Sequence, residues 1–352
     1  MSSLISGIQQ MGVGVTDLHE AWKWYRQNFG MDIRVFEDEA VAELMLPHTA
    51  GQPRKRYAAL AMNMQGGGGF EIWQHTGKTP EPCSFDILIG DLGINIAKVK
   101  SKDVRAAYHD FTEKELDLLG EVVTDPSGNM HFFVRDLYGN IFQVVNEEHV
   151  FMADKSVNGG IYGAMIGVTD FEKARTVYCD ILGYDEVVYD KEGVFDDLSG
   201  LPGGKETLRR VLLRHKEERM GPFSKLLGPS QIELICVKSR TPQKIYEGRI
   251  WGDPGFIHLC FDIQGMDGLR KRCAAKGFPF TVDSADSFDM GVAAGHFAYI
   301  EDPDGTLIEF VETHKLPIIE KIGWYMNIQK RKLGKRLPNW MVKTMSWGRI
   351  KD

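Results

Sequence analysis

Three side chains in the second half of the chain carry charge or an imidazole inside otherwise apolar segments. Glu233 stands in Gln-Ile-Glu-Leu-Ile, His258 in Phe-Ile-His-Leu-Cys, and Glu309 in Leu-Ile-Glu-Phe. Each segment has the short apolar run that is typical of a strand in a protein core. Burying an ionised group without a partner costs several kcal/mol, so each of these side chains should have one.

Two kinds of partner fit these residue types. One is a divalent cation, because one imidazole and two carboxylates suit zinc, manganese, nickel or ferrous iron. The other is a set of arginines on the preceding strand, which would pair with the glutamates while His258 stays neutral and hydrogen-bonded. These arginines are Arg209, Arg210 and Arg214. The residues alone leave both interpretations open.

An internal repeat indicates which elements position these residues. Val15-Thr16-Asp17 recurs as Val168-Thr169-Asp170, at an offset of 153 residues. In both copies the Asp can cap a helix, and apolar residues follow at helical spacing. A glycine, Gly30 or Gly183, then stands where a helix would end.

A second repeated motif lies near the end of each half. Asp136-Leu-Tyr-Gly-Asn and Asp302-Pro-Asp-Gly-Thr are both tight turns that lead into an apolar strand. Another strand and helix precede each turn. The order is therefore one strand, one helix and three strands, four times over. The approximate modules are 5–76, 90–147, 160–238 and 255–313.

One such module cannot bury the inner face of its own curved sheet, so the modules should pair. We expect an α+β protein in which the first module pairs with the second and the third with the fourth. The bend between the two resulting domains should lie in the polar, glycine-containing stretch at 154–160. The predicted domains are 1–153 and 154–314, followed by a basic, aromatic C-terminal extension at 315–352.

This arrangement resembles the vicinal oxygen chelate superfamily, which includes glyoxalase I, methylmalonyl-CoA epimerase, extradiol dioxygenases and bleomycin-resistance proteins. The resemblance rests on the repeated Val-Thr-Asp helix starts and on the ending Asp-Pro-Asp-Gly-Thr-Leu-Ile-Glu-Phe, and it covers about residues 5–313. It implies that metal ligands come from the first and last strands of each module. A His or Gln precedes the helix-capping residue by seven positions, and a Glu stands in the final strand.

In the second domain the resemblance implies a divalent metal ion held by Glu233, His258 and Glu309, with Glu233 or Glu309 as the catalytic base. Gly163 stands where relatives place the first His or Gln. That departure puts in doubt the two-histidine site of the ferrous dioxygenases in this superfamily.

In the first domain the corresponding positions are Gln10, Glu71, Asn95 and Gln143. Only Glu71 is charged among them, so we expect no tightly bound metal, and the domain is either structural or keeps a polar ligand pocket. Strand alternation makes His296 a further ligand-binding candidate facing the cavity, with Tyr299 on the opposite face.

The resemblance implies three classes of function. The first is a metal-dependent lyase, isomerase or epimerase acting on a small oxygenated substrate. There a cation would stabilise a developing enolate while a carboxylate moves the proton. The alternatives are a ferrous-iron dioxygenase and a metal-free protein that binds a small ligand in its cavity.

Composition limits the partners and the compartment. The formal net charge of −7 argues against general affinity for nucleic acid. Five cysteines without a Cys-x-x-Cys pair favour a reducing cytoplasm over a disulfide framework. Neither a signal peptide nor an apolar run of the ~20 residues needed for a membrane span is visible.

The extension at 315–352 differs from the rest of the chain. It carries ten Lys or Arg against two acidic residues, so its charge is +8 and that of the remaining chain is −15. It also holds four aromatic side chains, Trp324, Tyr325, Trp340 and Trp347. Either the extension wraps the acidic body and buries these aromatics, or it forms a docking surface for a membrane or an anionic partner.

Overall fold

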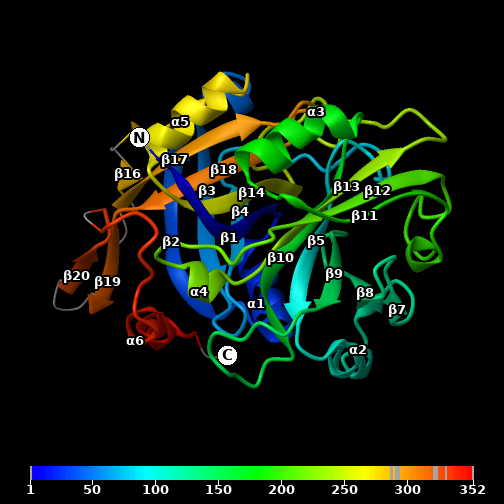
Figure 1. Cartoon of the computed structure of the whole chain (residues 1–352), viewed down its shortest axis with the longest axis horizontal. Coiled ribbons are helices and arrows are strands. Elements are labelled where there is room, and N and C mark those ends of the chain that lie inside the picture. The colour runs from blue at the N-terminus through cyan, green and yellow to red at the C-terminus, as the bar shows by residue number, and fades with distance from the viewer. Residues whose placement is uncertain (1, 286–287, 290–293, 320–323, 330, 351–352) are drawn as a thin grey trace.

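The computed structural model describes residues 2–285, 288–289, 294–319, 324–329 and 331–350 (Figure 1). The predicted order of four modules is confirmed. The first module contains β1 (Leu4–Gly14), α1 (Leu18–Phe29), β2 (Ile33–Ala42), β3 (Arg54–Met62) and β4 (Gly69–His75). The second contains β5 (Gly93–Ser101), α2 (Val104–Glu113), β6 (Asp117–Leu118), β7 (Val123–Thr124), β8 (Met130–Arg135) and β9 (Ile141–Asn146).

The second half repeats this order. The third module contains β10 (Asn158–Gly167), α3 (Phe171–Arg175) with a wider helical turn at Thr176–Ile181, β11 (Glu186–Gly193), β12 (Leu208–Arg214), α4 (Ser224–Leu227) and β13 (Gln231–Val237). The fourth contains β14 (Gly255–Gln264), α5 (Met266–Ala275), β15 (Val282–Asp283), β16 (Phe288–Asp289), β17 (Ala294–Glu301) and β18 (Leu307–Thr313). The extension forms β19 (Lys315–Ile319), β20 (Trp324–Asn327) and α6 (Asn339–Lys343).

The helices begin and end where the sequence predicts. The Asp17 carboxylate accepts a hydrogen bond from Glu20 N at the start of α1, and Asp170 does the same for Glu172 N at the start of α3. Gly30 ends α1 in the left-handed conformation, at φ 64°, which glycine adopts without steric cost.

The pairing of the modules differs from the prediction. One sheet, called here the first sheet, has the order β15-β17-β18-β14-β1-β4-β3-β2 and joins modules one and four. The second sheet has the order β11-β12-β13-β10-β5-β9-β8-β6 and joins modules three and two. Figure 1 shows the blue strands of module one beside the yellow and orange strands of module four. The prediction of pairing in chain order is therefore wrong.

The reason lies in the leading strands of the modules. β1 pairs antiparallel with β14, and β5 pairs antiparallel with β10. All four modules offer a similar leading strand, so nothing local in the sequence decides which two will meet. The choice depends on the whole chain packing together.

Modules that are consecutive in the chain still contact each other, through side chains of their helices. The hydroxyl of Tyr25 on α1 donates to Asp136 in the turn of module two at 2.6 Å, and Tyr178 donates to Asp302 in module four at 2.9 Å. Phe29 of α1 lies against Phe142 of β9, with ring centroids 4.9 Å apart. The helices thus connect modules one to two and three to four, while the sheets join one to four and two to three.

The extension is anchored to the body through a small apolar cluster. Leu337 and Val342 are buried there, together with Leu226 and Leu227 near α4. Among the residues that the structure describes, no helix has the length and apolar character to span a membrane.

Candidate metal centre

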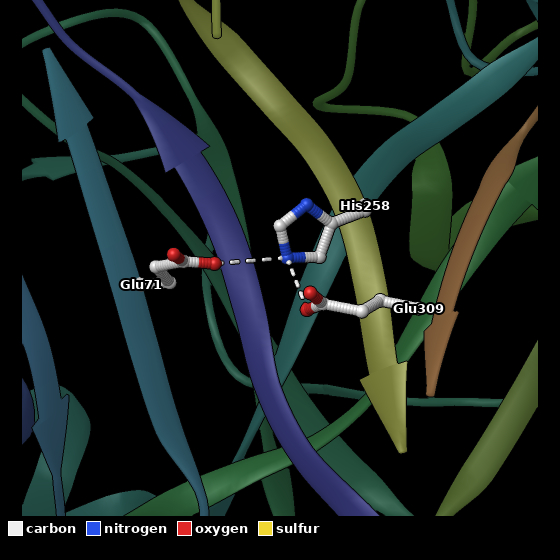
Figure 2. Close-up of side chains that lie close together, drawn as sticks. All are labelled: Glu71, His258 and Glu309. Carbon is white, nitrogen blue, oxygen red and sulfur yellow. Dashed lines mark ion pairs between the residues drawn. The ribbon is translucent and has the colours of Figure 1, made fainter. Parts of the chain in front are cut away.

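Four neighbouring strands of the first sheet bring four polar side chains to one point. They are Gln10 on β1, Glu71 on β4, His258 on β14 and Glu309 on β18. The strand register explains the convergence, because residues opposite each other in a sheet project from the same face. Gly12 is opposite both Glu71 and His258, and Cys260 is opposite both Gln10 and Glu309. Figure 2 shows Glu71, His258 and Glu309 pointing toward one another.

The distances are short enough for a shared ligand. His258 Nε2 lies 3.3 Å from Glu71 Oε2 and 3.1 Å from Glu309 Oε2. The amide of Gln10 reaches the same two oxygens, with Nε2 donating to Glu71 Oε2 at 3.2 Å and to Glu309 Oε2 at 3.4 Å. The ligand atoms of Glu71, His258 and Glu309 all lie within 4.8 Å of one another, so these three could hold a metal ion.

The electrostatics of the group favour a positive charge at this point. Burial on its own would lower the pKa of His258, but the carboxylates of Glu309 and Glu71 outweigh it and raise that pKa to about 9. Burial would raise the pKa of Glu309, yet His258 and Tyr299 beside it hold that pKa below its ordinary value. A cation bound between the carboxylates could take the place of the His258 proton as the positive charge of the site.

Polar atoms of the group lack hydrogen-bond partners. Within the described part of the chain, Gln10 Oε1 is buried without a hydrogen bond, and neither ring nitrogen of His258 makes one of acceptable geometry. Rotating the Gln10 amide by half a turn would direct its oxygen at the two carboxylates, and the oxygen and nitrogen of an amide are hard to distinguish. One imidazole nitrogen and three oxygens form a donor set that suits a divalent cation.

Gly12 provides the space for the imidazole. A Cβ atom at this position would lie 2.4 Å from Cε1 and 2.8 Å from Nε2 of His258. Real Cβ atoms do not approach other atoms so closely, so any larger residue would displace the ring. Gly12 was not identified from the sequence, because its role depends on the β1–β14 register.

Aromatic side chains pack against the candidate metal ligands. The Trp251 ring stacks on His258 with 6.5 Å between centroids, and Tyr299 meets His258 edge-on at 5.5 Å. Trp73 contacts Trp251 at 4.3 Å. Trp251 is buried, and among the described residues its indole N–H finds no hydrogen-bond partner. An unpaired buried donor is costly, so this N–H is free to donate to a bound molecule.

The structure does not bring Glu233 to this site. Glu233 lies on β13 in the second sheet, whereas His258 and Glu309 lie in the first. The predicted metal set of Glu233, His258 and Glu309 is thus wrong in one member. Glu71, which the sequence assigned to a separate pocket, takes that place because module one pairs with module four.

Glu233 is neutralised by side chains instead. Lys98 Nζ donates to Glu233 Oε2 at 2.6 Å, Arg210 Nε donates to Oε1 at 2.7 Å, and the Tyr189 hydroxyl donates to Oε1 at 2.8 Å. Despite burial, the charges of Arg210 and Lys98 hold the pKa of Glu233 well below its ordinary value. The arginine interpretation from the sequence therefore holds for Glu233, with Arg210 as the partner.

Of the four equivalent positions in the second sheet, that of Glu71 alone keeps a carboxylate, which is Glu233. By register, Lys98 stands opposite Gln143 as Cys260 stands opposite Glu309, so Ile96 takes the place of His258. Gly163 takes the place of Gln10. Gln143 is buried at the position of Glu309, with its side-chain oxygen unpaired, and it lies in the second sheet, apart from Gln10 and Glu71.

Two further sequence assignments are wrong because the side chain projects from the opposite face of its strand. Asn95 precedes Ile96 by one residue, so it does not project with the ligand positions. Its side chain donates to Asp91 O at 2.8 Å and accepts from Gly90 N at 2.9 Å, which fixes a loop. His296 lies on the face opposite to the cavity and pairs with Asp283 at 2.6 Å. Tyr299 is the residue that faces the site, since it is opposite Glu309.

Comparison with known proteins agrees with this fold. Two models with the same description, Glyoxalase/Bleomycin resistance protein/Dioxygenase superfamily, match residues 7–144 and 164–299. Glyoxalase I from Zea mays is 14% identical, with a TM-score of 0.55 over 88% of this chain and 92% of that one. A candidate dioxygenase from Bacillus subtilis is 12% identical, with a TM-score of 0.58 over 99% and 98%. At these identities the likeness concerns the fold alone. A search of curated protein sequences finds no match.

Proposed function

Since this chain belongs to the glyoxalase/bleomycin resistance protein/dioxygenase superfamily and carries two of its domains in tandem, we propose that it is a metal-dependent lyase, isomerase or epimerase. Its substrate would be a small oxygenated molecule that reacts through an enolate. The observation that carries the proposal is the convergence of Glu71, His258 and Glu309 on one point, with Gln10 beside them.

The residues present suit this chemistry. A divalent cation held by Gln10, Glu71, His258 and Glu309 would supply Lewis acidity to a substrate oxygen. Glu71 or Glu309 would take the proton from the adjacent carbon, because a carboxylate that leaves the cation is free to act as a base. Glu71 takes the place that the sequence assigned to Glu233, and Glu233 has no part in this proposal.

The surroundings suit a planar, partly apolar substrate. Trp251 and Tyr299 exclude water from the reacting atoms, and the unpaired Trp251 N–H is placed to bind a substrate oxygen. Trp251 and Leu307 also border a cavity of about 500 Å³. Leu307 is opposite His258 in the sheet, so the cavity borders the strands that carry the candidate ligands, and none of the four ligand side chains lines it.

The residue types argue against a ferrous dioxygenase. Oxygenases with the facial triad use two histidines and one carboxylate. Here the four converging residues include one histidine, His258, and two carboxylates. A protein that binds small ligands without metal is the remaining alternative, and metal analysis distinguishes it.

The test is the metal content of the purified protein after growth with added zinc, manganese, nickel and iron. We expect the wild type to carry one divalent ion per chain. His258→Ala and Glu71→Ala should carry none, while the surface control His109→Ala should match the wild type, because His109 is exposed. Circular dichroism would establish that the variants are folded. A wild type that is free of metal would reject the proposal in favour of a ligand-binding protein.

A further inference from the structure

The C-terminal extension leaves two tryptophans in solvent. Trp340 is 61% exposed and Trp347 is 71% exposed. They belong to one continuous helical segment, formed by α6 and the tighter turn at Thr344–Gly348. The interpretation that the extension buries its aromatics against the body is therefore wrong for these two. The side chains of Trp324 and Tyr325 lie outside the described part of the structure.

The exposure does not come from a loose end. The other side of the same segment is fixed, with Val342 buried against Leu226 and Leu227. Arg349 forms ion pairs with both Asp32 and Asp154. Ile350 N donates to Asp32 O at 2.9 Å, which ties the end of the segment to the loop after α1. The helix therefore presents one face firmly to the body and the tryptophans to solvent.

Exposed lysines occur in the same part of the chain as the tryptophans, and one of them, Lys343, also lies over the Phe151 ring at 5.9 Å. Lys332, Lys335 and Lys343 are exposed, and no carboxylate of the described residues lies within ion-pair distance of them. Lys343 stands between the two tryptophans in the sequence. The region 315–352 has a formal charge of +8 on a body of −15, so positive charge is concentrated at this end of the molecule.

Exposed indoles beside ammonium groups match the chemistry of an anionic bilayer surface. Indole rings partition into the headgroup region, and each nearby Lys adds about 1 kcal/mol of attraction to anionic lipid. A helix that protrudes at the edge of the molecule, as α6 does in Figure 1, can contact a flat surface without steric conflict. The acidic body would be repelled, so only this end would face the lipid.

We propose that the segment from Trp340 to Trp347, with Lys332, Lys335 and Lys343, docks the protein on an anionic membrane surface. Docking would be reversible and peripheral, because the apolar contribution comes from two side chains rather than from a spanning helix. This inference does not depend on the metal centre, so either can fail without the other.

The test is co-sedimentation of the full-length protein with vesicles of phosphatidylcholine alone and of phosphatidylcholine with one third phosphatidylserine. We expect binding only to the anionic vesicles, weakening as salt is raised. The double variant Trp340→Ser/Trp347→Ser should bind at least tenfold more weakly. The matched control Leu137→Ser/Val194→Ser, which removes exposed apolar side chains elsewhere, should bind as the wild type does.

A charge variant separates the two contributions. Lys332→Glu/Lys335→Glu/Lys343→Glu should abolish the preference for anionic vesicles and leave the metal content unchanged. Failure of the wild type to bind anionic vesicles would overturn the proposal, as would equal binding by the tryptophan double variant. Self-association in analytical ultracentrifugation that the double variant abolishes would assign the surface to a second copy of the chain, and the lipid proposal would then be abandoned.

Discussion

At the scale of single residues, the capacity to bind a metal depends on which positively charged side chain each buried carboxylate contacts. Glu71 and Glu309 meet one imidazole and an amide, which leaves them short of positive charge. Glu233 meets Lys98 and Arg210, which leaves it saturated. Glutamates in similar apolar strands thus have different capacities for a metal, and the difference lies in the side chains that each contacts from other strands.

Substituting Gly12 should weaken the centre without unfolding the protein. In Gly12→Ala the new methyl group would overlap the imidazole of His258, which must then move from the two carboxylates. We expect at least a tenfold loss in affinity for zinc or nickel, about 1.4 kcal/mol, measured by isothermal titration calorimetry. Gly348→Ala is the control, since its Cβ would have only an ordinary contact at 3.5 Å. An unchanged affinity in Gly12→Ala would mean that His258 does not bind the metal in this orientation.

Removing Lys98 should destabilise the second sheet. Lys98→Met leaves Glu233 buried with one cation fewer, and breaking such a pair costs about 3–5 kcal/mol. Urea unfolding would measure the loss, with the exposed Lys102→Met as a control expected within about 0.5 kcal/mol of the wild type. A loss no larger than that of the control would indicate that Arg210 alone neutralises Glu233.

At the scale of elements, the sequence predicts which helices and strands form better than it predicts which strands pair. The helix caps Asp17 and Asp170, the four modules and the apolar strands around His258 and Glu309 could all be predicted, because each depends on local spacing. The partner of each leading strand could not, since β5, β10 and β14 are similar candidates for β1. Because the strand pairing could not be predicted, Glu71 was assigned to a different site from His258, and Glu233 was wrongly grouped with His258.

Strand parity accounts for the other errors. Counting seven residues back from the cap Asp103 reaches Ile96, so Asn95, one position earlier, projects from the other face. His296 follows from strand alternation counted from the turn at Asp302, but the β17–β18 register puts Tyr299 opposite Glu309. In both strands the predicted residue faces away from the candidate ligands, because the register could not be read from the sequence.

Lys100 on β5 should make stability depend on pH. Its Nζ donates to the carbonyls of Gly66 and Leu227, and burial lowers its pKa to about 7. Between pH 7 and its ordinary pKa of about 10.4 the unfolded chain holds a proton at this residue that the folded chain lacks, so this contribution to stability rises with pH. Over this range we expect the wild type to gain stability relative to Lys100→Met in urea unfolding. A constant difference would mean that Lys100 keeps an ordinary pKa.

At the scale of the whole molecule, crossed pairing makes the halves interdependent. The centre takes Gln10 and Glu71 from one half and His258 and Glu309 from the other. Duplicated modules have thus produced one centre rich in ligands and one neutralised by side chains. In the second sheet Lys98 and Arg210 provide the positive charge at Glu233 that a metal would otherwise supply.

Separating the halves should therefore abolish metal binding. We expect neither residues 1–153 nor residues 154–352 to bind zinc when expressed alone, since each carries only part of the ligand set. Co-expression should restore binding as the two leading strands β1 and β14 pair. Stoichiometric zinc binding by 154–352 alone, measured by equilibrium dialysis, would contradict the crossed arrangement.

The most direct test of the central claim is anomalous diffraction from crystals of the full-length protein grown with zinc or manganese. The account predicts one strong anomalous peak per chain, within about 2.0–2.2 Å of atoms from Glu71, His258 and Glu309, with Gln10 Oε1 as a further ligand. It also predicts no peak beside Glu233. A peak between Glu233 and Lys98, or none at His258 in protein with bound metal, would contradict it.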